Sequence, residues 1–150
     1  MKRMFCLSVM VSLLGATPAF CGDSTTVKNW SNVQTYELAT LKKNIESQTR
    51  KIVGVRFNFR GKDIHHMKPN WYESSLWQPN PGGKGFVDVQ VMVAKKDLPA
   101  FKAIPTDAQS AQVITIYGQV LRDSEANFPF VRLMGRNATP DQSGNAILSW

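Results

Sequence analysis

The sequence predicts a small, mainly β domain with two helices, made with an export signal at its N-terminus. Residues 1–21 follow the order of regions typical of a signal peptide, and four later segments alternate apolar and polar side chains with period two. The chain has 150 residues, of which 43% are hydrophobic and 19% charged, so it suits one globular domain with its own core.

The predicted signal peptide begins with Lys2 and Arg3, which precede an apolar run over residues 5–14. Small residues and a proline follow, as a cleavage region requires. A run of about ten residues is too short to cross the ~30 Å hydrocarbon core of a bilayer as a helix. We therefore expect a periplasmic or secreted protein that meets the membrane only during export.

Two cleavage points fit this region, one after Ala19 and one after Cys21. Lipid attachment to Cys21 is a third alternative, although the bulky Phe20 stands where a small residue is needed. Residues 22–150 contain no cysteine, so this part of the chain can form no internal disulfide and offers no thiol nucleophile.

Two helices are predicted in the mature chain. Residues 22–50 comprise a polar, flexible lead-in and a helix over residues 31–49. The apolar face of this helix consists of Leu38, Leu41 and Ile45. A second, short helix is predicted over residues 97–104. Its apolar face consists of Leu98, Phe101 and Ile104.

Four strands are predicted over residues 51–60, 86–94, 112–122 and 128–136, because β-branched and aromatic residues recur there with period two. We expect one face of these strands to form the core. The residues expected to be buried are Val55, Phe57, Val89, Val91, Ile116 and Val131.

The stretch over residues 61–85 shows little period and is predicted to be a long ordered loop, with a short strand over residues 72–78 as an option. Its end, residues 81–85, has the composition of a hairpin turn. Residues 138–150 are predicted to form a C-terminal tail.

The order of these elements over residues 51–137 resembles the OB-fold: a long strand, a loop, a strand, a short helix and two more strands. The segment over residues 113–120 is similar to the fourth strand of that family, where a glycine, here Gly118, lets the strand bend around a small barrel. The resemblance implies a small β-barrel. OB-folds bind oligonucleotides or oligosaccharides on one face and its loops, but a fold does not fix a function.

Cationic and aromatic residues of the strands and the loop are the candidate ligand-binding residues. Arginines beside aromatic rings suit phosphates and bases, whereas the alternative is a solvated strand face with its rings in the core. We expect the four arginines to converge. The candidates are Arg56, Arg60, Trp71, Tyr72, Trp77, Tyr117, Phe130, Arg132 and Arg136.

Charge favours an anionic partner. Without Lys2 and Arg3 the chain keeps 16 of its 18 basic residues against 11 acidic ones, which gives a mature net charge of +5. The alternative is that this charge serves only solubility.

Catalytic and metal-binding motifs are weak. The adjacent His65 and His66 point to opposite sides of an extended chain and lack a third ligand at a recognisable spacing, so no metal and no cofactor is expected. A hydrolase would depend on His65, His66 and Glu73.

We therefore expect an exported binding or interaction module, not an enzyme, whose partner is an anionic oligosaccharide, nucleic acid or an envelope protein. The alternatives are a structural subunit of a cell-envelope assembly and, with less support, a small hydrolase.

Overall fold

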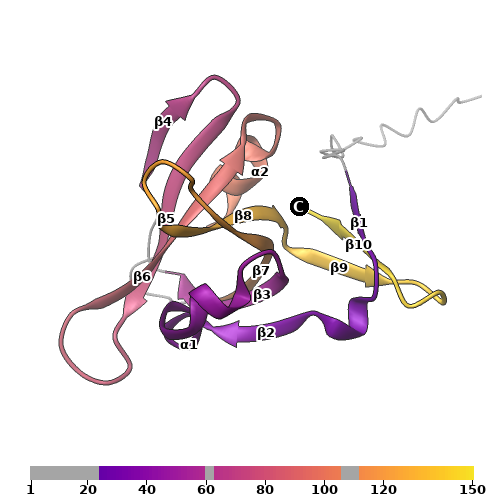
Figure 1. The fold of residues 1–150 in the computed structure, drawn as a ribbon, viewed down its shortest axis with the longest axis horizontal. Coiled ribbons are helices and arrows are strands. Elements are labelled where there is room, and N and C mark those ends of the chain that lie inside the picture. Colours follow the sequence, from indigo (N-terminus) through magenta and orange to yellow (C-terminus); the bar gives the residue numbers. More distant parts are fainter. Residues whose placement is uncertain (1–23, 60–62, 106–111) are drawn as a thin grey trace, which may run out of the picture.

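The computed structural model describes residues 24–59, 63–105 and 112–150, so the expected signal peptide and Arg60 lie outside the described residues. Two sheets and two short α-helices make up the described part, which confirms a mainly β class (Figure 1). The strands are β1 (Thr25–Val27), β2 (Gln34–Glu37), β3 (Ile52–Phe59), β4 (Ile64–Lys68), β5 (Trp71–Pro79), β6 (Phe86–Ala94), β7 (Gln112–Arg122), β8 (Pro129–Gly135), β9 (Asn137–Pro140) and β10 (Ala146–Ser149). The helices are α1 (Leu38–Asn44) and α2 (Leu98–Ala103), with 3₁₀ turns η1 (Trp30–Asn32), η2 (Ile45–Gln48) and η3 (Lys95–Asp97).

The larger sheet has seven strands in the order β2-β3-β7-β8-β6-β5-β4. Its neighbours are antiparallel except for the parallel pairs β2–β3 and β6–β8. One face of the central strands is packed into the core, and all six residues that the sequence predicted to be buried lie there. They are Val55, Phe57, Val89, Val91, Ile116 and Val131.

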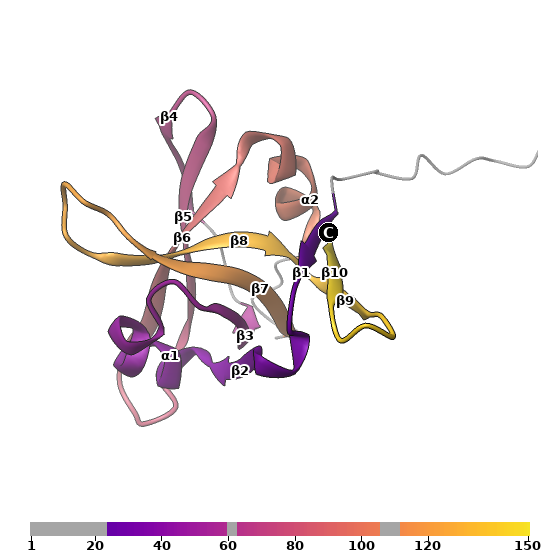
Figure 2. The same ribbon diagram turned by 45° about the vertical axis from the view of Figure 1, so that its right-hand side comes forward.

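The two helices close this core from opposite sides of β7 and β8, as both views show (Figures 1 and 2). Their apolar faces are buried as the helical spacing predicted. The buried residues are Leu38, Leu41 and Ile45 from α1 and η2, and Leu98, Phe101 and Ile104 from α2 and its C-terminal end.

The first helix is much shorter than the prediction over residues 31–49. Only Leu38–Asn44 is α-helical, and the residues before it form η1 and β2. The reason is tertiary, because Gln34–Glu37 pair in parallel with β3. That pairing satisfies the backbone groups that a longer helix would otherwise have satisfied.

The larger sheet is open, so the closed barrel expected from the sequence is not confirmed. Strand β2 occupies the edge of β3 along Val53–Arg56, which leaves little of that edge for β5. Farther along β3, the backbone N–H of Asn58 donates to the Gln78 side-chain oxygen on β5 at 2.8 Å. In a closed barrel, backbone hydrogen bonds would join β3 to β5. Within the described residues this side-chain contact joins the two strands instead.

The stretch predicted as a long loop is a β-hairpin made of β4 and β5, and β5 includes the short strand foreseen over residues 72–78. The predicted turn before β6 is confirmed, since the N–H of Asn80 donates to the carbonyl of Gly85 at 3.0 Å. No helix in the described part of the chain is long and apolar enough to cross a membrane.

Thr25–Val27, which lie in the lead-in predicted to be flexible, form a strand, and so do two segments at the C-terminal end of the chain. Strands β1, β10 and β9 form a three-stranded antiparallel sheet, in which Thr26 pairs with Ile147. A Cβ atom at Gly135 would lie only 2.6 Å from the carbonyl oxygen of Ser149, so glycine is what lets β10 approach the end of β8. Residues near the start of the described chain are thereby paired with residues near its C-terminus.

Candidate functional site

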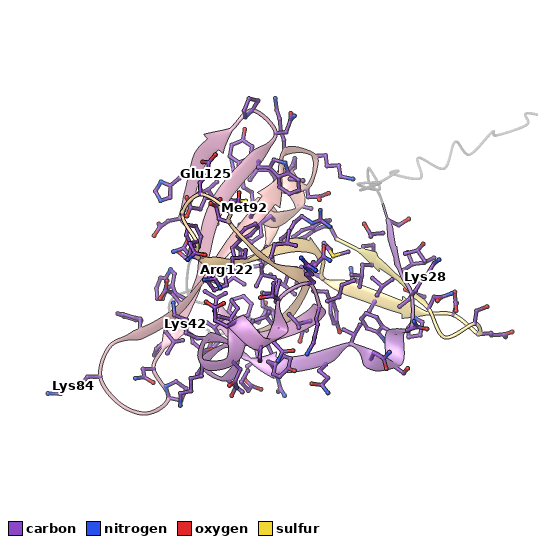
Figure 3. The ribbon with its side chains drawn as sticks, viewed as in Figure 1. Lys28, Lys42, Lys84, Met92, Arg122 and Glu125 are labelled. Atoms are coloured by element: carbon purple, nitrogen blue, oxygen red, sulfur yellow. The ribbon has the colours of Figure 1, made fainter. Side chains whose placement is uncertain are left out.

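A cleft of about 320 Å³ opens on the face of β5, β6, β8 and β7 that points away from the core. We call it the aromatic cleft. Figure 3 shows two of its residues, Met92 and Arg122, close together beneath the β7–β8 loop that carries Glu125. Its lining residues are Trp71, Glu73, Met92, Leu121, Arg122, Asp123, Ser124, Phe130 and Arg132.

Strand register assembles this cleft from four strands. Glu73 of β5 pairs with Met92 of β6, and Met92 pairs with Arg132 of β8. Neighbouring strands lie about 4.8 Å apart, so Glu73 and Arg132 are separated by about 10 Å across the sheet. Residues about sixty positions apart in the sequence thus share one face because β6 and β8 run in parallel side by side.

Arg132 is held in position by the neighbouring strand. Its Nη2 donates to the side-chain oxygen of Gln119 on β7 at 2.9 Å. A guanidinium carries five N–H donors, so this contact uses only a part of its capacity. The half-buried Arg132 side chain therefore keeps donors for a ligand in the cleft.

Arg122 has a structural role instead. Its Nη1 pairs with the carboxylate of Glu46 in η2. Its Nε donates to the Asn127 side-chain oxygen at 2.7 Å, and its Nη2 donates to the carbonyl of Asn127 at 3.2 Å. These contacts tie the β7–β8 loop to η2 and leave Arg122 with little capacity for a ligand.

The β7–β8 loop is folded around Asp123. One carboxylate oxygen of Asp123 accepts hydrogen bonds from the N–H groups of Glu125 and Ala126, at 2.8 and 2.7 Å. This is the turn-forming use of aspartate. With Glu73 and Asp123 against Arg122 and Arg132, the formal charges of the cleft lining balance to zero.

Three of the predicted aromatic and cationic residues, Trp71, Phe130 and Arg132, meet in the aromatic cleft. Tyr72 packs against the core instead. Trp77 makes an edge-to-face contact with Phe86, with ring centroids 5.2 Å apart. Tyr117 makes the same kind of contact with Trp30, also at 5.2 Å.

The three predicted arginines within the described residues do not form one cluster. Arg132 lies opposite Gln119 of β7, whereas Arg56 lies opposite Thr115. Four residues along a strand span about 13 Å, and the two arginines flank β7 on different sides. Arg56 is exposed and has its own partner, Glu37, at 3.8 Å.

Arg136 follows the last residue of β8 and directs its backbone N–H to the carbonyl of Ser149 at 2.8 Å. It does not line the aromatic cleft. Arg60, the fourth predicted arginine, lies outside the described residues.

Five lining residues were not predicted from the sequence, and Glu73 was named only for a hydrolase. The five are Met92, Leu121, Arg122, Asp123 and Ser124. The available signal was alternation, because Met92 occupies an outward position between the buried Val91 and Val93. Outward apolar residues on a strand are candidates for a binding face.

The residues named for a catalytic or metal centre lie on the β4–β5 hairpin. His65 lies opposite Glu73 across β4 and β5, but neither side chain has a hydrogen-bond partner among the described residues that would orient it. The His66 side chain lies outside the described part. No group of three or more His, Cys, Asp and Glu residues that could hold a metal ion occurs in the described ranges.

A comparison of the sequence with protein-family models and with curated proteins finds no match, so the geometry of the site carries the functional argument alone.

Proposed function

We propose that this protein is an exported binding module that holds an oligosaccharide in the aromatic cleft. One observation carries the proposal: the half-buried indole of Trp71 lines the same cleft as Glu73 and Arg132. An aromatic face can pack against a sugar ring, while charged side chains beside it hydrogen-bond the hydroxyl groups.

The charge of the lining favours a sugar over a nucleic acid. Proteins that bind single strands line their grooves with positive charge that follows the phosphates. Here Glu73 and Asp123 offset the two arginines, and Arg122 is already paired with Glu46. A phosphate chain in this cleft would face two carboxylates.

We also propose that the domain is a partly open relative of the OB-fold. The support is the order β3-β7-β8-β6-β5, the parallel pairing of β6 with β8, and the position of α2 between β6 and β7. The contact between Gln78 and the backbone of Asn58 joins the first and last of these five strands. Small barrels of this family use one outer face and its loops for ligands.

We propose as well that the protein is exported and that it binds its ligand without catalysing a reaction. The leader over residues 1–21 supports export. A role as structural subunit of an envelope assembly is the alternative. It predicts stable protein partners and no glycan affinity.

The test is a glycan array followed by titration calorimetry on the mature protein. Trp71→Ala should weaken binding of the best glycan about tenfold or more, because it removes the stacking face. The matched control is Trp77→Ala, since Trp77 lies on the same strand but outside the cleft and packs on Phe86. Unchanged binding in Trp71→Ala, or equal loss in both variants, would contradict the cleft assignment.

The same experiment separates the alternatives. Turnover of a glycan that is lost in His65→Ala would favour the hydrolase. The absence of glycan binding, together with co-purification of an envelope protein, would favour the structural subunit.

A further inference from the structure

A second groove, of about 440 Å³, lies between the N-terminal segment and the start of β3. We call it the polar groove. It shares no lining residue with the aromatic cleft. Its lining residues are Val27, Lys28, Asn29, Asn32, Val33, Gln34, Tyr36, Gln48, Arg50, Lys51, Ile52, Val53 and Gln119.

The charge of the polar groove is one-sided. Lys28, Arg50 and Lys51 line it, and none of its lining residues is a carboxylate. The aromatic cleft, by contrast, balances its charges. Positive charge without an internal counterion favours an anionic ligand.

Amide side chains supply most of the remaining polar lining. Five asparagine and glutamine residues line the groove, together with Tyr36. Gln34, Gln48 and Gln119 already accept hydrogen bonds through their side-chain oxygens. One of these glutamines fixes a cation, because the Lys51 ammonium donates to the side-chain oxygen of Gln48 at 3.3 Å. The side chains of Asn29 and Asn32 keep donors and an acceptor, which suit hydroxyl groups.

The backbone of the groove adopts uncommon conformations at two non-glycine residues. Asn29 has φ 54° and Arg50 has φ 70°. Asparagine tolerates this left-handed region, but arginine does so at a cost.

Neighbours on β7 hold Arg50 in this conformation. Its N–H donates to the carbonyl of Val120 at 2.7 Å, and its carbonyl accepts from the Gln119 side chain at 3.3 Å. Left-handed non-glycine residues that the surrounding structure enforces tend to cluster at functional sites. Here two of them line one cationic groove.

We infer that the polar groove is a second binding site, which takes a small sugar that carries an oxyanion. The three cations bind the carboxylate, sulfate or phosphate, and the amides of Asn29 and Asn32 bind the hydroxyl groups. This inference goes beyond the proposed function, because the two sites share no lining residue and differ in charge, although Gln119 of the polar groove also accepts a hydrogen bond from Arg132 of the aromatic cleft.

The experiment is a titration of the mature, isotope-labelled protein followed by amide NMR. The probes are glucuronate, glucose 6-phosphate, inorganic phosphate and glucose. We expect saturable shifts of the Arg50 and Lys51 amides with both sugar anions, weaker binding of inorganic phosphate, and none with glucose. Comparison of the two sugar anions distinguishes a carboxylate from a phosphate as the preferred group.

The key variant is Lys28→Gln/Lys51→Gln, which removes two groove charges at exposed positions. We expect the Kd of the better sugar anion to rise about threefold to tenfold, as for two exposed ion pairs. The matched control is Lys43→Gln/Lys84→Gln, with the same charge change at exposed sites outside the groove. Figure 3 shows Lys84 and Lys28 at opposite ends of the molecule.

Three results would overturn the inference. They are equal weakening in both double variants, binding of glucose as tight as that of the sugar anions, and no saturable shift with any probe. The aromatic cleft would survive each of these results, because its test uses Trp71→Ala and a separate glycan.

Discussion

Substitution of Gly118 by alanine tests the close contact between β7 and β8 that places Arg132 in the aromatic cleft. A Cβ atom at position 118 would lie 2.6 Å from the carbonyl oxygen of Arg132 and 2.6 Å from a methyl carbon of Val131. Ordinary contact begins at 3.4 Å, so β8 would have to move by about 0.8 Å. The obstacle is partly backbone, which cannot rotate away as a side chain can.

Such overpacking costs about 1–3 kcal/mol, and we expect the upper half of that range because a strand pairing must yield. Urea unfolding followed by tryptophan fluorescence measures it. With an m-value of roughly 1.5 kcal/mol per molar urea, a loss of about 2 kcal/mol in unfolding free energy lowers the urea midpoint by about 1.3 M. Glycan affinity should fall as well, because Arg132 moves with β8.

The matched control is Gly82→Ala in the turn before β6, where the nearest atom to an added Cβ is 3.6 Å away. We expect that midpoint to stay within about 0.3 M of the original, as for most surface substitutions. If the urea midpoint of Gly118→Ala changed as little as that of Gly82→Ala, β7 and β8 would not approach as closely as described. Arg132 would then not be held in the aromatic cleft by this contact.

Three further substitutions test other parts of the structure. Phe57→Ala should cost about 3–5 kcal/mol in chemical unfolding, because the ring is 1% exposed, and a loss below about 1 kcal/mol would place the ring at the surface. Arg50→Gly should raise the unfolding free energy by about 1 kcal/mol while weakening sugar-anion binding; a loss of stability would show that φ 70° carries no strain there. Leu148→Ala should cost about 2–5 kcal/mol in thermal or urea unfolding, whereas its exposed neighbour Ile147→Ala should cost little, and equal effects would refute the packing of β10.

The strands that bury a complete apolar face could be predicted from the sequence. The predicted ranges 86–94 and 112–122 coincide with β6 and β7. Alternation reports burial directly, because every second side chain of a strand points into the core.

Strand β5 was foreseen only as a short option, because polar residues interrupt its inward face. Ser74 and Gln78 occupy buried positions where the pattern requires apolar side chains. Gln78 is there to accept a hydrogen bond from the backbone of Asn58, a partner twenty residues away. A contact of that kind leaves no periodic signal in the sequence.

The candidate sites were predictable in part. Trp71, Phe130 and Arg132 stood among the predicted ligand-binding residues, and they meet only because β6 and β8 pair in parallel. The polar groove was not predicted at all. Its cations Lys28 and Lys51 come from the lead-in and from the junction before β3, which have no recognisable motif.

The sequence by itself determined the mainly β class, four of the five long strands described, the buried face of each of these four and the apolar faces of the two helices. Those features depend on local spacing and burial. The tertiary structure alone decided that Gln34–Glu37 form a strand and that β1 pairs with β10. It also decided that the large sheet stays open and that two separate clefts form, one neutral and one cationic. Short segments of this kind take the conformation that satisfies their backbone hydrogen bonds, and the strand edges that offer those bonds exist only after the core has formed.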